Sequence, residues 1–364
     1  MKDKIKPSQL FYILVSYILG STLLLSLVDN MMKQDAWLAL CISFALSIPF
    51  VILFSILVKK FPGKSLMEIN TLVFGNIAGN VISALYFVYI FLLLALNIEF
   101  VSGFFTGYIL IETPKIIIIV FFTLTSAFAV KRGVGAIGKA SLPVAVFSVG
   151  IIVITTLLLI GKMDFANFLP VFGLPTGSYV QVCYVLITVP FLDIVALMMV
   201  TSHLDGHKHI TRSMLGGVAA AGAGLLCIVV RNTAALGTAA SVVGNSSYEA
   251  ARLIDIGEFL TRIEMLVTIG FTSCVFIKIS MLYYASVNSF SQLLKLRDSK
   301  PLILPMGSVA VVVAAVLFRS SAANTDWGSR YHMFWATPFT MIFPLLTLLV
   351  AKIRRLGQVS EDKK

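Results

Sequence analysis

Charged side chains are scarce in this sequence, and the scarcity excludes an ordinary soluble globular protein. Asp, Glu, Lys and Arg make up 12% of the 364 residues, whereas 58% are hydrophobic. A soluble domain carries roughly a quarter charged residues. The shortage is concentrated in long apolar runs, which leave no room for a sizeable soluble domain. The composition therefore predicts one polytopic membrane domain over residues 1–364.

Cysteine is also scarce, and the residues that enzymes use are not grouped. The cysteines lie in separate apolar runs without CxxC spacing, which indicates small packing residues: Cys41, Cys183, Cys227 and Cys274. No set of Ser, His and Asp, or of Cys and His, is assembled for nucleophilic catalysis. We therefore expect a protein that is not an enzyme.

Two short patterns resemble ligand sites but lack the context that such sites need. Residues 133–138 have GxGxxG spacing, yet a dinucleotide site needs a strand before it and a helix after it. Here the run joins two apolar segments. Residues 203–209 hold three histidines and an aspartate in a short polar loop, with no second cluster to close a metal site. We expect no cofactor and no metal.

The apolar runs are long enough to cross a bilayer, and they must do so as helices because an isolated strand cannot satisfy its backbone in lipid. We place them at about residues 9–28, 36–58, 80–110, 115–130, 141–160, 178–201, 213–230, 258–290, 302–318 and 333–351. The sequence thus predicts an all-α integral membrane protein with about ten transmembrane helices.

The basic residues alternate between strong and weak clusters along the chain. Of the 28 Lys and Arg residues, 19 fall on one side of the predicted membrane, 7 on the other and 2 within the eighth run. Because basic loops stay in the cytoplasm, both termini are predicted to be cytoplasmic. The net charge of +11 then reflects the basic loops on the cytoplasmic side of the membrane, and we expect no nucleic-acid partner.

The first and sixth runs are interrupted near their middles. A proline removes a helical hydrogen bond, and a glycine lowers the cost of unwinding. Broken helices expose backbone groups that bind a substrate or an ion at mid-membrane depth. We predict that the ligand lies against the two breaks, which carry Gly20, Ser21, Thr22, Pro190, Phe191, Leu192 and Asp193.

The two breaks occupy equivalent positions if the chain consists of two inverted five-helix repeats. The repeats would span about residues 9–160 and 178–351, followed by a short cytoplasmic tail at 352–364. Paired breaks in the first helix of each repeat point to a central binding site. The alternative is an ordinary proline kink and a packing glycine, both common in membrane helices.

Three ionisable residues lie deep in predicted spans, namely Glu99, Asp193 and Lys278. Such residues are expensive in a membrane and are functional candidates by default. In one interpretation, Lys278 supplies a fixed positive charge where related transporters hold a sodium ion, with Asp193 or Glu99 as its counter-charge. In the other, a buried ion pair only fixes helix packing.

Short motifs along nearly the whole chain resemble a known family. Besides the Gly20 break, they lie at residues 61–66, 111–114, 169–171, 190–193, 262–264, 276–280 and 353–355. In order and spacing they resemble the B-subunit of spore nutrient-germinant receptors, a branch of the amino acid–polyamine–organocation transporter superfamily. Two positions depart from the family pattern. Ser21-Thr22 follows Gly20 without the usual second glycine, and Leu192-Asp193 stands in place of Gly-Glu.

The resemblance implies a multi-pass protein of the inner spore membrane, with two inverted repeats and broken helices one and six. It also implies a receptor A-subunit that is a membrane protein, and a C-subunit lipoprotein, as partners. The B-subunit would bind a small nutrient, often an amino acid, in a mid-membrane pocket and trigger germination. A proton- or sodium-coupled amino acid permease and a passive channel are the alternatives, because fold does not fix function.

Overall fold

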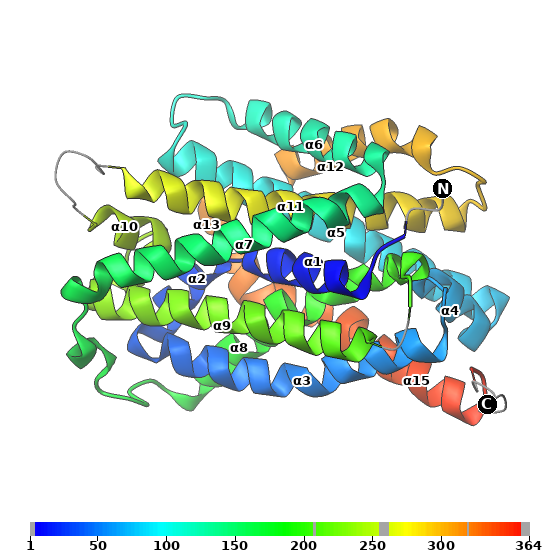
Figure 1. The fold of residues 1–364 in the computed structure, drawn as a ribbon, viewed down its shortest axis with the longest axis horizontal. Helices are drawn as coiled ribbons and strands as arrows, with labels where there is room; N and C mark the ends of the chain where they lie inside the picture. Colours follow the sequence, from blue (N-terminus) through cyan, green and yellow to red (C-terminus); the bar gives the residue numbers. More distant parts are fainter. Residues whose placement is uncertain (1–3, 207–208, 255–261, 319, 358–364) are drawn as a thin grey trace.

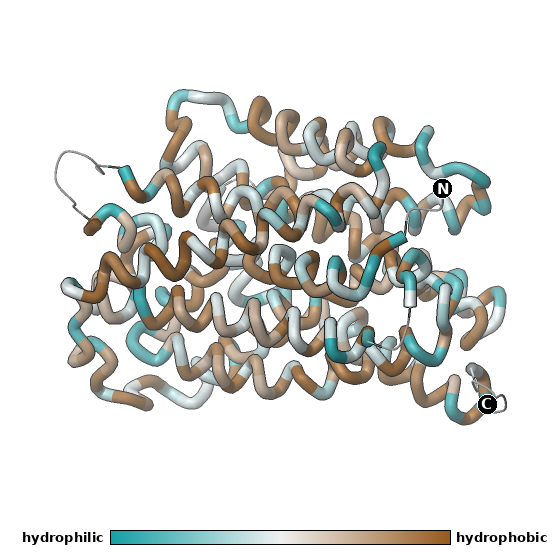
Figure 2. Tube along the Cα trace, in the orientation of Figure 1, coloured by the Kyte–Doolittle hydropathy of each residue, from teal (hydrophilic) through white to brown (hydrophobic). Residues whose placement is uncertain are grey.

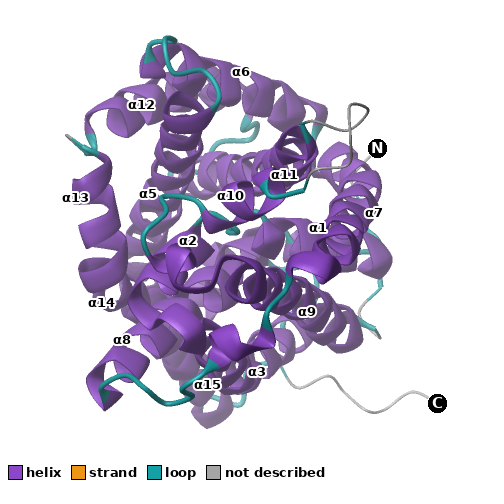
Figure 3. Ribbon diagram, turned by 90° about the vertical axis from the view of Figure 1, so that its left-hand side faces the viewer, coloured by secondary structure: helices purple, strands orange, loops and turns teal. Residues whose placement is uncertain are grey.

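The computed structural model describes residues 4–206, 209–254, 262–318 and 320–357. These residues form helices joined by loops (Figure 3). Within this part of the chain, β-pairing is limited to one isolated bridge between Ile5 and Leu204. The predicted all-α class is confirmed.

The helices of the first half are α1 (Pro7–Leu19), α2 (Leu24–Met32), α3 (Ala36–Lys60), α4 (Leu66–Phe74), α5 (Asn76–Tyr108), α6 (Lys115–Arg132) and α7 (Val134–Leu159). Those of the second half are α8 (Thr176–Leu186), α9 (Ile210–Leu236), α10 (Ser246–Arg252), α11 (Ile263–Leu293), α12 (Ile303–Val316), α13 (Ser321–Asp326), α14 (His332–Thr337) and α15 (Phe343–Ile353). π-Helical and 3₁₀ segments continue several of them, including η4 (Ile187–Leu192), η5 (Asp193–Met199), η10 (Trp327–Tyr331) and η11 (Pro338–Ile342).

Seven helices among the described residues are long and apolar enough to cross a membrane. They are Leu24–Lys60, Asn76–Tyr108, Val134–Lys162, Thr176–Met199, Ile210–Ser241, Ile263–Leu293 and Ala323–Ile353. The chain is therefore a multi-pass membrane protein. The other predicted spans fall on the shorter helices α1 and α12 and on α6, which has basic residues at both ends. The predicted start of the eighth span, at residue 258, lies outside the described residues.

Glycines end two of the helices. Gly75 follows α4 with a φ of 85°, and Gly133 follows α6 with a φ of 90°, in the left-handed region that glycine adopts without strain. Gly133 also leads directly into α7, so residues 133–138 connect two helices. At the start of α4, the Ser65 hydroxyl accepts a hydrogen bond from the Glu68 N–H, and the Glu68 carboxylate accepts one from the Ser65 N–H.

The helices form one elongated bundle (Figure 1) in which α1 is enclosed by α7, α9 and α11. Helix α11 in turn contacts α5, α6 and α7. The hydrophobic colours of Figure 2 run along the helices, while the hydrophilic ones gather in the loops at the two ends. In Figure 1, α1 begins at the same end of the bundle at which α3, α11 and α15 end. The centre of this bundle, where α1, α5, η5 and α11 meet, holds the candidate site.

Candidate ligand-binding site

The first predicted span is interrupted between α1 and α2. The chain between Leu19 and Leu24 forms a tight turn rather than an open loop. The N–H groups of Gly20, Ser21 and Thr22 donate to backbone carbonyls three or four residues earlier, at 2.8, 2.9 and 3.1 Å. These amides are therefore engaged within the turn, and the side chains offer the more accessible groups for a ligand.

Gly20 brings this turn against α11. Its φ of −61° and ψ of −10° are available to any residue, so backbone conformation does not demand a glycine. The lack of space does demand a glycine, because a Cβ at position 20 would lie 3.0 Å from the Cys274 carbonyl oxygen and 3.2 Å from the Lys278 Cβ. The close approach sets the turn of span one beside Lys278.

The second break lies in the sixth span, between α8 and η5. Val189 has extended backbone angles, with φ −142° and ψ 122°, inside an otherwise helical stretch. Pro190 follows it and has no N–H to donate to the preceding turn. The helical chain then resumes at Asp193, the first residue of η5, whose side chain is fully buried. The break thus delivers a carboxylate to the middle of the bundle.

Lys278 of α11 and Asp193 form a buried ion pair at this point. The Lys278 Nζ lies 2.7 Å from the Asp193 Oδ2, and it donates to the Ser21 Oγ at 2.5 Å. It also lies 4.7 Å from the centre of the Tyr17 ring, an attractive cation–π arrangement. The Tyr17 hydroxyl donates to the Asp193 carbonyl oxygen at 3.3 Å. One ammonium therefore connects spans one, six and eight.

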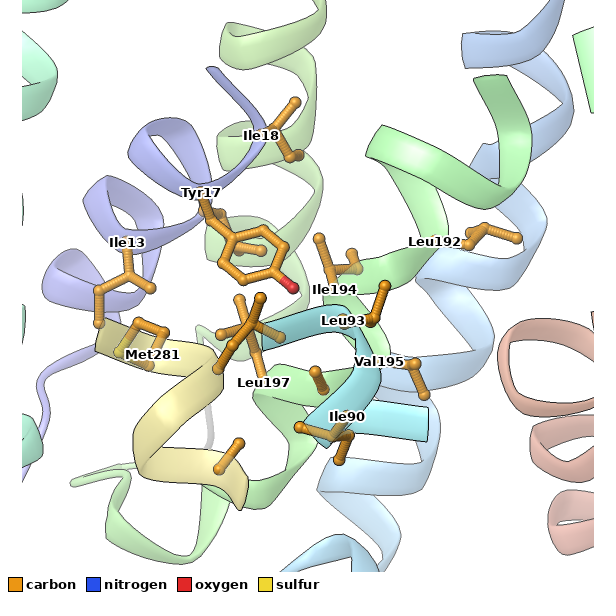
Figure 4. Packing of buried hydrophobic residues seen from close by; sticks show 14 of the residues in the cluster. Ile13, Tyr17, Ile18, Ile90, Leu93, Leu192, Ile194, Val195, Leu197 and Met281 are labelled. Carbon is orange, nitrogen blue, oxygen red and sulfur yellow. The ribbon is translucent and has the colours of Figure 1, made fainter. Parts of the chain in front are cut away.

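Apolar side chains surround these polar groups on one side of the site. Figure 4 shows Tyr17 of α1 pointing toward Ile194 and Leu93, with Met281 of α11 below α1. Tyr17 and Ile194 are both at most 1% exposed. A low-dielectric wall of this kind strengthens the attraction between Lys278 and Asp193.

A cavity of about 90 Å³ opens on the other side of the ion pair. We call it the central cavity. Gly20, Ser21, Asp193 and Lys278 form its polar end. Its remaining polar lining comes from Asn97 of α5 and from Asn324, Trp327 and His332 of the last helical segments, and leucines of α2 and α5 supply apolar surface.

Three polar atoms of the central cavity are buried without a hydrogen-bond partner among the described residues. They are the Asp193 Oδ1, the Trp327 Nε1 and the His332 Nε2. Buried polar atoms in native proteins are nearly always paired with protein groups, water or a ligand. An acceptor on Asp193 and a donor on Trp327 thus belong to side chains that line one small cavity, which is suited to a ligand with both kinds of group.

The seven residues predicted to bind the ligand do not all reach this cavity. Gly20, Ser21 and Asp193 line it. Thr22 lines a different cavity, on the far side of the turn. Pro190, Phe191 and Leu192 are buried and are absent from the described lining of the central cavity. Their ligand-binding role remains a prediction.

Glu99 has partners of its own. Its Oε1 lies 2.5 Å from the Lys115 Nζ, and its Oε2 accepts a hydrogen bond from the Asn324 side chain. The counter-charge of Lys278 is therefore Asp193. Glu99 acts on the central cavity through Asn324, which lines it. The described residues contain no group of three or more His, Cys, Asp or Glu side chains placed to hold a metal ion.

Sequence reasoning missed the contribution of the last span. The prediction began this span at residue 333, whereas the helical chain already begins at α13 and continues through η10 into α14. Asn324, Trp327 and His332 all precede residue 333. Two polar residues and a tryptophan within nine positions, next to an apolar run, were the available signal.

The sequence of this chain is similar to known proteins over most of its length. Residues 4–323 match the model of a family described as spore germination protein. Spore germination protein KB of Bacillus subtilis (strain 168) is 24% identical over 375 aligned positions, which cover 100% of this chain and 99% of the relative. Putative spore germination protein YfkT of the same organism is 25% identical over 332 positions, which cover 89% of each chain.

Two solved structures share the fold. MhsT in complex with L-phenylalanine superimposes with a TM-score of 0.68 at 14% identity, covering 94% of this chain and 97% of MhsT. Mhp1, a nucleobase-cation-symport-1 family transporter in a closed conformation with bromovinylhydantoin bound, gives a TM-score of 0.59 at 11% identity. That match covers 99% of this chain and 81% of Mhp1. At these identities the likeness concerns the fold alone.

Proposed function

We propose that this chain, which belongs to the family of spore germination proteins, is a nutrient-germinant receptor subunit that binds an amino acid in the central cavity. The observation that carries the proposal is the set of three unpartnered polar atoms on Asp193, Trp327 and His332 around one small cavity. The subunit carries no catalytic step in this proposal, because binding alone is the signal.

An amino acid matches the chemistry of the central cavity. Its ammonium would donate to the Asp193 Oδ1, and its carboxylate would accept from the Trp327 N–H. Lys278 pairs with the Asp193 Oδ2 and leaves the Oδ1 for the ligand. The fold of MhsT, a protein solved with L-phenylalanine, supports the same ligand class.

Binding becomes a signal if it shifts a conformational equilibrium. The ligand would bridge the turn of span one, the break of span six and the last span, and would favour the state in which all three contact it. Partner subunits, a membrane-bound A-subunit and a C-subunit lipoprotein, would detect that shift in the inner spore membrane.

The proposal includes a topology of ten spans in two inverted five-helix repeats, with both termini in the cytoplasm. The interruptions of the first and sixth helices at one cavity support the repeats. The position of the start of α1 and the end of α15 at one end of the bundle supports an even number of crossings (Figure 1). Impermeant thiol labelling of single cysteines placed in each loop tests the sidedness.

A working amino acid permease is the second candidate, and the shared fold of Mhp1, a transporter, favours it. Such a permease would couple substrate movement to protons or sodium. The fixed ammonium of Lys278 argues against a sodium requirement, because Asp193 already has a cation 2.7 Å from its Oδ2. Proton coupling stays compatible with the site.

Equilibrium binding and substrate counterflow on the same proteoliposomes distinguish the two candidates. A labelled amino-acid panel is applied to the wild type, to Asp193→Asn and to Asp298→Ala, an exposed aspartate outside the cavity that serves as the control. A receptor gives saturable binding without counterflow, and this binding is lost only in Asp193→Asn. Counterflow by the wild type would establish the permease instead. Absence of both in the chain co-expressed with its partner subunits would refute an amino-acid site.

A further inference from the structure

A second cavity, of about 30 Å³, lies on the opposite side of the span-one turn from the central cavity. Thr22 lines it, whereas the adjacent Ser21 lines the central cavity. Its other polar lining includes Thr155 of α7, Arg231 of α9 and Ser247 of α10. We call it the arginine cavity, because Arg231 is its charged residue.

Arg231 is among the most completely buried large side chains of the protein, at 2% exposure. Its Nη1 donates to the Thr155 Oγ1 at 2.7 Å, and its Nε and Nη2 donate to the Asn232 Oδ1 at 3.2 and 2.9 Å. These acceptors are neutral. A guanidinium has five N–H donors, so two remain beyond these three bonds.

The charge of Arg231 has no direct counter-ion in the described part of the chain. No carboxylate oxygen there lies within 4.0 Å of it. The acid that belongs to the same network is Asp29, whose Oδ2 accepts from the Ser246 hydroxyl. Asn232 separates the two charges, because it accepts from Arg231 and donates to Ser246 at 3.4 Å.

An unpaired buried charge is expensive, and the expense is smaller when an ion of opposite sign contacts it. The cavity beside Arg231 is small, at about 30 Å³, a third of the volume of the central cavity. We infer that the arginine cavity binds one monovalent inorganic anion of chloride size, held by Arg231 and by the hydroxyl of Ser247, which accepts from Asn232 and has no described acceptor of its own.

The test is equilibrium binding of radioactive chloride to the purified full-length chain in nanodiscs, together with its thermal unfolding in sodium chloride and in sodium gluconate. We expect one saturable chloride per chain and a higher Tm in chloride, because binding to the folded state stabilises it. Gluconate is too large for the cavity and should give no shift.

Variants assign the ion to this cavity. Arg231→Gln should abolish saturable chloride binding, and Arg231→Lys should weaken it about tenfold, because a lysine does not reproduce the guanidinium geometry. Arg262→Gln changes an exposed arginine and should bind chloride like the wild type. If Arg231→Gln does not fold, Ser247→Ala, which removes the available lining hydroxyl and keeps the arginine, should still weaken binding.

Two results would overturn the inference. One is a wild type that binds no chloride and has the same Tm in chloride and gluconate, as expected of a cavity that holds only water. The other is saturable chloride binding that persists unchanged in folded Arg231→Gln, which would place the anion elsewhere. Neither result depends on whether the central cavity binds an amino acid.

Discussion

Gly20 lies against the backbone of Cys274, so closely that a Cβ at position 20 would stand 3.0 Å from the Cys274 carbonyl oxygen. The contact fixes the span-one turn to α11 one helical turn before Lys278. A side chain at position 20 would therefore move the turn away from Lys278, whose ammonium donates a hydrogen bond to the Ser21 hydroxyl.

Substitution of Gly20 by leucine should weaken amino-acid binding and lower stability together. Overpacking of this kind costs about 1–3 kcal/mol of the free energy of unfolding. Calorimetric binding and chemical unfolding in detergent measure the two effects. Gly150→Ala is the control, because no heavy atom outside its own helix backbone and chain neighbours lies within 4 Å of a Cβ there. Equal behaviour of the two variants would contradict the close contact.

Removal of one partner of the Lys278–Asp193 pair should be more damaging than removal of both. Lys278→Met or Asp193→Asn alone leaves a buried charge without its partner, at a cost of about 3–5 kcal/mol. The double variant removes both charges and should recover part of that loss. A double-mutant cycle on unfolding free energies measures the coupling. Strictly additive losses would mean that the two charges do not interact.

The indole N–H of Trp327 should contribute to ligand binding and little to folding. Trp327→Phe keeps most of the ring and removes an N–H that has no described partner in the protein. We expect about tenfold weaker amino-acid binding, the value of one charge-assisted hydrogen bond, with an unchanged Tm. Trp37→Phe removes an equally unpartnered N–H outside the central cavity and should bind like the wild type.

Amino-acid binding should not require sodium. Replacement of sodium by choline in the binding assay is expected to leave the dissociation constant unchanged, because Lys278 already supplies the cation beside Asp193. The same replacement in Lys278→Ala shows whether an added cation substitutes for the ammonium. A wild-type affinity that falls as sodium is removed would contradict a fixed-charge site.

The break of the sixth span was visible in the sequence because its cause is local. Pro190 cannot take part in a helical hydrogen bond wherever it lies in the bundle, so its effect follows from its identity. Gly20 was placed correctly but for a different physical reason. The sequence suggested easier unwinding, whereas the structure uses the absent side chain for close packing against Cys274.

The partner of Lys278 depends on geometry that the sequence does not contain. Asp193 and Glu99 were both candidates, because each lies within an apolar run. Asp193 is the partner because η5 is rotated so that this residue faces α11. Segment η5 begins only after the extended backbone of Val189. Likewise, the adjacent Ser21 and Thr22 face different cavities, because successive residues in a tight turn point in different directions.

The contribution of the last span was hidden because its polar residues lower the local hydropathy. Asn324, Trp327 and His332 belong to a continuous helical stretch with π-helical segments, which hydropathy alone assigns to a loop. Residues that face a cavity inside a membrane protein need not be apolar. The residues most useful for recognition are therefore the ones that a search for apolar runs discards.

The ammonium of Lys278 is part of the protein, so its presence in the site does not depend on a concentration in solution. The occupancy of a sodium site depends on the sodium concentration. Ligand binding beside such a site therefore depends on both the ligand and sodium. Lys278 is attached to its own helix, 2.7 Å from Asp193, and is present in the site at every salt concentration. If the central cavity binds a nutrient, as proposed, a cell whose ion gradients have run down would still detect it, because the occupancy would depend on the nutrient alone.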